Sequence, residues 1–555
     1  MSGAAKSISG ATISNLQLNN AAGFSLTGSP TITDVLNLNA GALSIGSNTI
    51  TFHTGNTPIV RTSGTLTTTA SSNLVFGTNG NTGGSAFTLP NSLFTTASFG
   101  SFTINRTKTL TWNTQSPTLA GDLNLTAGIL STAVNFNLGG NITGTGTQSG
   151  SGVISMTGAS KTISGATLAN LQLNNAAGFS LTGSPLVTDV LTLTNGALTI
   201  GNNTLTFQTG NTPIVRNGVS QTGTLTMTAT SNLVFGTVGN TAGSAFTLPD
   251  NCFTSNPEFA SLTINRTNSL TLNNQPMAVR HLLQLTQGTL ILPAGYVFPL
   301  RSLSIANTAM VGQIGNNAGI QYGTGAIFKV ERHIPQTGAG IRAYRDIAPS
   351  VNTGSGTIYQ NWQESGTNGL ENGIYYGTHI TGKTGAAPGG VDAASGLDKT
   401  QTAAVGVSFM RSNPTTGKSE WISKTSSKLA GDTLTALQGY RVLIRGNRLV
   451  NLYQNPTPAT MNAGATLRAS GKLITGDVVY TTTGTTANGY TNTAVRLNSG
   501  ELTGFTMLGN PYASPIVWDS LVNNSTNIQP TYWLFDPNVG SAGGDNYHNA
   551  PLPRP

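Results

Sequence analysis

Aromatic and acidic side chains that could bind or cleave a carbohydrate gather late in the sequence, where four of the five tryptophans lie. Ligand sites combine exposed aromatic rings with a few converging polar groups, which makes Trp362, Trp518 and Trp533 the candidates for a ligand platform. Apolar neighbours such as Ile516 and Val517 accompany Trp518. A buried indole ring removes about 150–250 Å² from water. We therefore expect the three rings to act mainly as anchors of a core.

Recognised catalytic motifs do not occur in the sequence. The five histidines are dispersed, and there is neither a Gly-x-Ser-x-Gly turn nor a His-Glu-x-x-His helix. Only five acids lie in residues 1–300, and Asp34 and Asp189 occupy equivalent positions of a repeat. An active site is normally a single place, so a duplicated acid indicates a structural role. We expect no enzymatic activity and no catalytic residue; paired carboxylates acting on a polysaccharide are the alternative.

Metal and cofactor sites are not expected either. Neither an EF-hand loop nor the calcium-binding Gly-Gly-x-Gly-x-Asp nonapeptide occurs. Asp536 and Asp545 could hold calcium, but their Gly/Asn-rich surroundings are more typical of a flexible tail. Cys252 is the only cysteine, which excludes an intrachain disulfide and argues against a cysteine zinc site.

Composition narrows the class of protein further. Charged residues make up 8% of the 555, and the net charge of +8 comes without a cluster of lysine or arginine. Nucleic-acid binding normally needs a concentrated basic stripe, so we expect no nucleic-acid partner. No run of about 18 apolar residues occurs, so the sequence predicts no membrane-spanning helix.

An internal duplication is the strongest signal in the sequence. Residues Asn15–Pro30 recur identically as Asn170–Pro185, 155 residues later. Asn73–Gly77 recurs as Asn232–Gly236, after a four-residue insertion in the second copy, and Ile104–Thr107 recurs further along as Ile264–Thr267. The first residues of the chain align with the middle of the second copy, beginning at Met156. We therefore expect the chain to be a fragment of a longer protein with further repeats.

Within each copy, apolar and polar residues alternate with period two, as in a half-buried strand. Residues Val35–Gly46 show this pattern, with Gly41 as a turn between two short strands, and the theme returns at Leu191–Leu198 and Leu283–Leu290. Short strands, Gly/Asn turns and uncharged outer faces favour a β-solenoid, in which Thr and Asn form hydrogen-bonded ladders between turns. Tandem β-sandwich domains of about 155 residues each are the competing interpretation.

These patterns predict an all-β protein with three parts. Residues 1–150 form a first repeat unit, truncated at its start, and residues 151–310 form a second. From residue 311 to 555 the repeat stops and charges, Trp and Tyr increase, which predicts a globular β-sandwich-like domain. Helix is expected to be scarce, with one turn starting at Trp518–Leu521.

A series of short blocks in the last part of the chain carries a family resemblance. The blocks are Val330–Pro335, Arg342–Val351, Asn361–Glu364, Tyr376–Gly382, Gly439–Gly446, Gly509–Trp518 and Tyr532–Pro537. In this order they resemble the large secreted surface proteins of the Bacteroidota that the type IX secretion system exports. The resemblance implies secretion and surface display, with a signal peptide and a C-terminal sorting domain outside these 555 residues. It implies no catalytic residues.

The sequence as a whole thus predicts a secreted, extracellular or cell-surface protein, non-enzymatic, with a structural or adhesin-like role. Its partners would be a glycan or a surface, or other copies of the chain in a fibre. A carbohydrate-binding or carbohydrate-active β-solenoid is the alternative. Alternating threonines at Thr65–Thr67 and Thr224–Thr228 could order water, which makes ice binding a minor alternative. Arginines of the last part, namely Arg342, Arg345, Arg441 and Arg445, are expected to pair with Glu331, Glu364 or Asp346.

Overall fold

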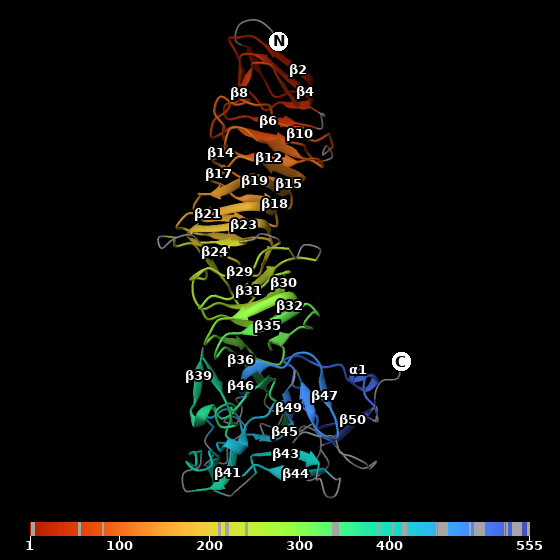
Figure 1. Ribbon diagram of the computed structural model, residues 1–555. Helices are drawn as coiled ribbons and strands as arrows, with labels where there is room; N and C mark the ends of the chain where they lie inside the picture. The colour runs from red at the N-terminus through yellow and green to blue at the C-terminus, as the bar shows by residue number, and fades with distance from the viewer. Residues whose placement is uncertain are drawn as a thin grey trace. The chain divides into compact units, whose positions relative to one another are not determined.

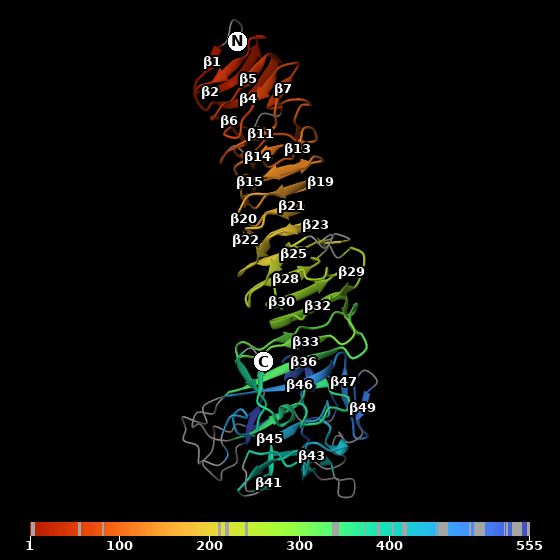
Figure 2. The same ribbon diagram turned by 90° about the vertical axis from the view of Figure 1, so that its left-hand side faces the viewer.

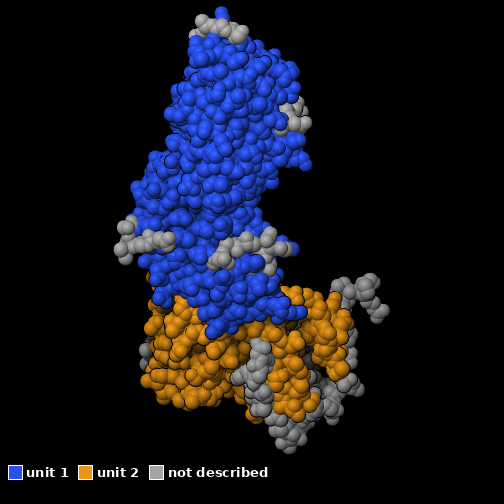
Figure 3. Space-filling view, turned by 45° about the horizontal axis from the view of Figure 1, so that its top comes forward, with its two compact units in different colours: residues 1–275, 285–291, 315–321 blue, residues 276–284, 292–314, 322–555 orange. Residues whose placement is uncertain are grey.

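The computed structural model shows a β-solenoid of about 18 turns, followed by a separate sheet region (Figure 1). It describes residues 1, 6–53, 57–79, 83–208, 212–216, 221–238, 242–335, 343–371, 373–385, 389–401, 405–412, 419–450, 452, 464–487, 490–492, 506–526, 528, 531–535 and 547–551. Two compact units share the chain, the first holding residues 1–275, 285–291 and 315–321 and the second holding the remaining residues (Figure 3).

The strands of the first unit pair in parallel with strands about one solenoid turn later in sequence, which Figure 2 shows as a stack of rungs. Strand β2 (Thr12–Asn19) pairs with β4 (Thr31–Ala40), and Leu16 lies opposite Leu36. Parallel pairing of this kind along the repeats confirms the predicted solenoid. Tandem sandwiches, which are built of antiparallel sheets, are not the structure that the chain adopts.

The period-two pattern explains why these segments form strands. In β4 the side chains of Leu36 and Leu38 are buried, whereas Asn37 between them is half-buried. Successive side chains of a strand point to opposite faces, so each turn places its apolar residues inside the coil and its polar residues outside. Gly41 then turns the chain with φ of 78°, a left-handed conformation that favours glycine.

The two sequence copies fold into equivalent strands. The first copy contains β2, β3 (Phe24–Leu26), β4, β5 (Ala42–Ser44), β6 (Thr49–Phe52), β7 (Ile59–Arg61), β8 (Thr65–Thr67), β9 (Asn73–Phe76), β10 (Phe87–Thr88), β12 (Phe102–Asn105) and β13 (Leu110–Trp112). The second contains β21 (Thr167–Asn174), β22 (Phe179–Leu181), β23 (Leu186–Asn195), β24 (Ala197–Thr199), β25 (Thr204–Phe207), β26 (Ile214–Val215), β27 (Thr224–Thr226), β28 (Asn232–Phe235), β29 (Phe246–Thr247), β30 (Glu258–Asn265) and β31 (Leu270–Thr271). The register is also repeated, because Leu171 of β21 lies opposite Leu191 of β23.

Further strands complete the solenoid. They are β1 (Lys6–Ile8), β11 (Ser98–Phe99), β14 (Thr118–Leu119), β15 (Leu123–Ala127), β16 (Ile129–Thr132), β17 (Phe136–Leu138), β18 (Ile142–Gly144), β19 (Thr147–Met156), β20 (Lys161–Ile163), β32 (Ala278–Leu292), β33 (Val297–Leu300), β34 (Met310–Val311) and β35 (Ala318–Tyr322). The division between the two compact units falls within β32 and β35.

In the second unit, β36 (Ile327–Ile334) is the strand at which the continuous series of parallel pairs ends. This strand is parallel to β33 and antiparallel to β46 (Ala465–Leu473), so it ends the parallel stack. A four-stranded sheet has the order β37 (Ala343–Ile347), β45 (Tyr440–Ile444), β43 (Val407–Ser412) and β44 (Ser419–Ser423).

The rest of the second unit consists of short strands and very little helix. The strands are β38 (Val351–Asn352), β39 (Gly369–Glu371), β40 (Ile374–Tyr376), β41 (Thr381–Thr384), β42 (Asp398–Thr400), β47 (Val478–Tyr480), β48 (Thr485–Ala487), β49 (Tyr490–Asn492), β50 (Thr531–Phe535) and β51 (Tyr547–Pro551). Helix α1 (Trp518–Asn523) confirms the turn predicted at Trp518. Within the described ranges, no helix has the length and apolarity needed to cross a membrane.

Candidate functional site

The three tryptophans proposed as a platform have different surroundings. Trp362 is 3% exposed, and its ring packs edge-to-face on Tyr440 with 5.6 Å between the ring centres. Trp518 is half-buried in α1, with its ring 5.1 Å from that of Tyr532. Trp533 lies in β50, but its side chain is outside the described part of the chain. Burial as a core anchor is thus confirmed for Trp362, and Trp518 is partly covered.

Among the tryptophans whose side chains the structure describes, the most exposed is one that is not a candidate from the sequence. Trp421 on β44 is 39% exposed, and the guanidinium carbon of Arg441 on β45 lies 4.3 Å from the centre of its ring. Arg441 also donates to both carboxylate oxygens of Asp346, at 3.1 and 3.3 Å. Ser419 and Ser423 share the face of Trp421 on this strand, and their polarity is the sign of exposure that the sequence offers.

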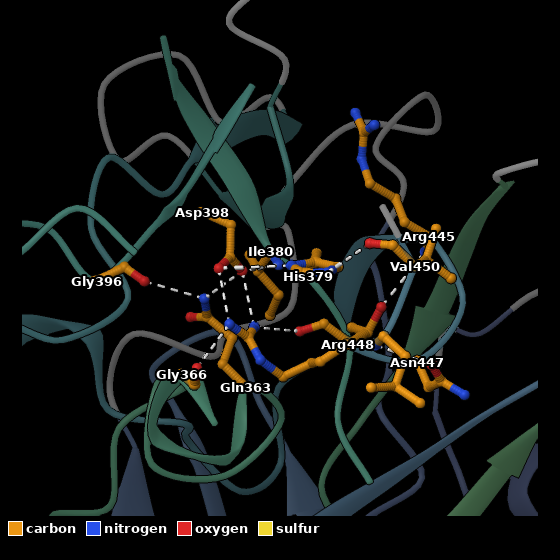
Figure 4. A network of polar contacts seen from close by, with 12 residues as sticks. Gln363, Gly366, His379, Ile380, Gly396, Asp398, Arg445, Asn447, Arg448 and Val450 are labelled. Atoms are coloured by element: carbon orange, nitrogen blue, oxygen red, sulfur yellow. Dashed lines mark hydrogen bonds and ion pairs between the residues drawn. The ribbon is translucent and has the colours of Figure 1, made fainter. Parts of the chain in front are cut away.

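Buried polar side chains form a network around Asp398, the first residue of β42 (Figure 4). Arg448 donates to both of its carboxylate oxygens at 2.9 Å, and both side chains are almost completely buried. The side-chain amide of Gln363 and the backbone N–H of Ile380 donate to the same carboxylate, at 3.0 and 2.8 Å. Four donors on one carboxylate satisfy a buried charge that would otherwise be costly.

His379 adds a contact that resembles part of a catalytic triad. Its Nδ1 lies 3.6 Å from Oδ1 of Asp398, and its Nε2 lies 3.1 Å from the carbonyl oxygen of Val450. In a triad the second imidazole nitrogen faces a nucleophile. Here it faces a backbone carbonyl, and the ring is buried, so this geometry holds the loop at Val450 and offers no proton to a substrate.

The pKa of Asp398 reflects these contacts. Burial on its own would raise the pKa, but the contacts with His379 and Arg448 outweigh burial and hold the pKa of Asp398 below its ordinary value. The carboxylate is therefore ionised at neutral pH and serves as the acceptor at the centre of the network.

A second set of charges alternates in sign through the same unit. Arg468 binds Glu364 at 2.6 and 3.0 Å and Glu371 at 2.5 Å. Arg301 continues the series, with Glu371 at 2.8 Å and Glu331 at 2.7 Å. From the sequence, Glu331 and Glu364 are expected to pair with Arg342, Arg345, Arg441 or Arg445. Both pair instead with arginines that are distant in sequence.

Among the arginines that the sequence predicts to pair with acids, Arg441 has an expected partner. Arg441 pairs with Asp346, as described above. Arg345 donates to its own neighbour, the carbonyl of Tyr344, at 3.2 Å. The backbone N–H of Arg445 lies 3.4 Å from the hydroxyl of Thr378, and Arg342 lies outside the described residues.

Glu331 and Glu371 are the carboxylates that most resemble an acid–base pair, because their pKa values move in opposite directions. Burial raises the pKa of Glu331. Burial would also raise that of Glu371, but Arg301 and Arg468 outweigh it and lower the pKa. A glycosidase pair must face a substrate. The side chain of Glu331 is 0% exposed and both carboxylates bind Arg301, so this arrangement is a structural ion-pair series.

Metal ligands do not converge in the part of the chain that the structure describes. No group of three or more His, Cys, Asp or Glu side chains there is arranged to hold an ion. Comparison with known proteins adds no family, since no family model, no curated protein and no solved structure matches the chain.

Proposed function

We propose that the chain is a secreted, cell-surface protein that has a structural or adhesin-like role and is not an enzyme. The observation that carries this proposal is the ladder of uncharged side chains between successive turns. The amide of Asn124 on β15 donates to the hydroxyl of Thr103 on β12 at 3.0 Å. The hydroxyl of Thr143 on β18 donates to the amide oxygen of Asn124 at 2.6 Å. These polar groups form hydrogen bonds with one another, as expected of side chains that hold successive turns of the solenoid together.

The charges of the second unit support the same proposal. In the two networks described above, arginines bind the acidic side chains, and Asp398 and Glu331 are buried. Such carboxylates stabilise a fold and are not placed to protonate a glycosidic bond.

An assay of polysaccharide hydrolysis tests the absence of a reaction. We expect the full chain to release no reducing sugar from a panel of plant, algal and bacterial polysaccharides. Turnover that disappears in Glu364→Gln or Asp519→Asn would contradict the proposal, because the carboxylate removed by that substitution would then be a catalytic group. The adhesive role is tested by the retention of protein-coated beads on polysaccharide- and protein-coated surfaces, relative to albumin-coated beads.

Carbohydrate binding is the second candidate, and the exposure of Trp421 favours it. A partly exposed indole ring beside Arg441 and Asp346 combines an apolar face with hydrogen-bonding groups. On this alternative, Trp421→Ala lowers retention on immobilised polysaccharide several-fold, whereas Leu370→Ala, at an exposed residue on β39, leaves it unchanged. Equal retention of the two variants would remove this candidate.

A further inference from the structure

Two buried arginines occupy equivalent places in the two copies of the repeat. Arg106 follows β12 and Arg266 follows β30, each within the shared sequence Ile-Asn-Arg-Thr. Both are 0% exposed and are among the largest fully buried side chains of the described chain. Because the same unusual burial occurs twice, at different points of the solenoid, it is a property of the repeat.

Each guanidinium makes the same hydrogen bond to a described residue. Nη2 of Arg106 donates to the carbonyl of Ser85, and Nη2 of Arg266 donates to the carbonyl of Ser244, both at 2.8 Å. In both residues Nε and Nη1 are buried and have no hydrogen-bond partner among the residues that the structure describes. A guanidinium has five N–H donors, so most of the donors of each side chain are unused.

Neither guanidinium has a carboxylate partner in the part of the chain that the structure describes. Across the described ranges, the acids that pair with arginine do so elsewhere, at Arg301, Arg411, Arg441, Arg448 and Arg468. The ring of Phe246 lies 6.0 Å from the guanidinium carbon of Arg266, which offers a weak contact through its face. Aromatic contact does not use the N–H donors.

The cost of this arrangement points to a missing partner. Arginine keeps its positive charge in proteins, and removing an unpaired charge from water is strongly unfavourable. Burial accordingly lowers the pKa of Arg106 and Arg266. A fold that repeats such a charge twice needs something to neutralise it.

We propose that Arg106 and Arg266 each bind one small monovalent anion of the halide class at N–H groups that the hydrogen bond from Nη2 leaves free. Each site holds one positive charge, and no second cation lies among the described partners of the arginine. A monovalent anion therefore balances the charge of the site. Because the site is buried, a small monatomic anion fits it better than a larger anion such as a sugar acid or a phosphate. The anions are integral parts of the solenoid, one in each copy, and the inference does not depend on the proposed function.

Bromide, which scatters X-rays anomalously, locates such anions directly. Crystals of the full chain grown in sodium bromide are expected to show an anomalous difference peak beside the guanidinium groups of both arginines. The absence of a peak at both would overturn the proposal. A peak at only one of them would overturn the claim that the site belongs to the repeat.

Thermal unfolding gives an independent measurement in solution. At constant ionic strength, replacing sodium gluconate by sodium chloride is expected to raise the unfolding midpoint by several degrees, since a ligand of the native state stabilises it. The rise is expected to be smaller in Arg106→Met and Arg266→Met, and absent in the double variant. Equal midpoints in both salts for the unsubstituted protein would overturn the proposal.

The other duplicated arginines provide matched controls. Arg61 and Arg216 are equivalent to each other and half-buried, and their Nε atoms donate to the carbonyls of Gly64 and Gly223 at 2.8 and 2.9 Å. Arg61→Met and Arg216→Met are expected to keep the full response to chloride. Loss of the response in these variants would show that chloride acts on arginines in general and would also overturn the proposal. Arg106→Lys keeps a charge and serves as the second variant if Arg106→Met does not fold.

Discussion

Arg448 and Asp398, 50 residues apart in sequence, are joined by two hydrogen bonds of 2.9 Å in a position that water does not reach. A bidentate pair of this kind fixes both distance and orientation. It connects the start of β42 to the segment after β45, so it determines how two stretches of the second unit meet.

Removing the charge of Asp398 is expected to destabilise the second unit strongly. Asp398→Asn leaves the guanidinium of Arg448 buried without its anion, a change that typically costs about 3–5 kcal/mol. Urea unfolding at pH 7, followed by tryptophan fluorescence, measures the loss. Asp519→Asn, at an exposed residue of α1, is the control and should change the free energy of unfolding little. Equal effects of the two substitutions would refute this assignment.

The same carboxylate predicts a dependence on pH. The pKa of Asp398 is lower in the folded protein than its ordinary value of about 3.9. A depressed pKa contributes stability that is fully present above pH 3.9 and is lost as the pH falls through the folded value. Below pH 4, the unsubstituted protein should therefore lose stability faster than Asp398→Asn. Parallel stability curves for the two proteins would contradict this.

Two tryptophans should respond differently to truncation. Trp362 is buried against Tyr440, so Trp362→Ala is expected to cost about 3–5 kcal/mol. Trp421 is partly exposed, and Trp421→Ala should cost much less, about 1 kcal/mol, from the lost contact with Arg441. Acrylamide should quench the fluorescence of Trp421 readily and that of Trp362 poorly. Comparable unfolding free energies for the two variants would be inconsistent with these environments.

Two substitutions of Trp518 can distinguish the contribution of its ring from that of its N–H group. Its Nε1 is buried and has no hydrogen-bond partner among the described residues, so Trp518→Phe should be nearly neutral, since a buried donor without a partner contributes nothing favourable. Trp518→Ala should destabilise the region because it also removes the packing on Tyr532. Thermal unfolding of both variants measures the difference. A Phe variant as unstable as the Ala variant would mean that the N–H group matters after all.

Two glycines with positive φ should tolerate alanine to different degrees. At Gly41, with φ of 78°, an added Cβ would overlap the carbonyl oxygen of Asn20. At Gly46, with φ of 60°, the nearest atom would be 3.8 Å away, on the side chain of Asn48. We expect Gly46→Ala to cost about 1 kcal/mol and Gly41→Ala several times more. Similar melting temperatures of the two variants would refute the expected clash.

The thiol of Cys252 is expected to be unreactive in the folded protein. Burial raises the pKa of Cys252 to about 12, so at pH 8 only about one thiol in ten thousand is a thiolate, the reactive form. Labelling with Ellman's reagent should be slow in buffer and complete in guanidinium chloride. The equivalent residue in the first copy is Leu93, and Cys252→Leu should fold normally. Rapid labelling of the native protein at pH 8 would show that the thiol is accessible.

Local patterns allowed most of the solenoid to be predicted. Leu36 and Leu38 alternate with polar residues, and both are buried. A glycine was required at position 41 because of its left-handed backbone. A strand, a turn and a shared register are properties of a few neighbouring residues, so one sequence is enough to indicate them.

The polar networks depend on contacts between distant residues and were not predictable. Nothing near Asp398 indicates that Arg448 binds it. The exposure of Trp421 depends on its strand's position in the sheet β37–β45–β43–β44. The burial of Arg106 also contradicts the usual tendency of arginine to lie on the surface. Its repetition at Arg266 was the one signal available in the sequence.

The identical register of the two copies has a consequence for how such a protein changes in evolution. Leu16 faces Leu36 just as Leu171 faces Leu191, so a turn from one copy fits on a turn from the other. Recombination between the two identical segments would add or delete a whole copy and leave every remaining strand with a suitable neighbour. The number of turns is thus a trait that selection can adjust in steps of one repeat, without redesigning the interior.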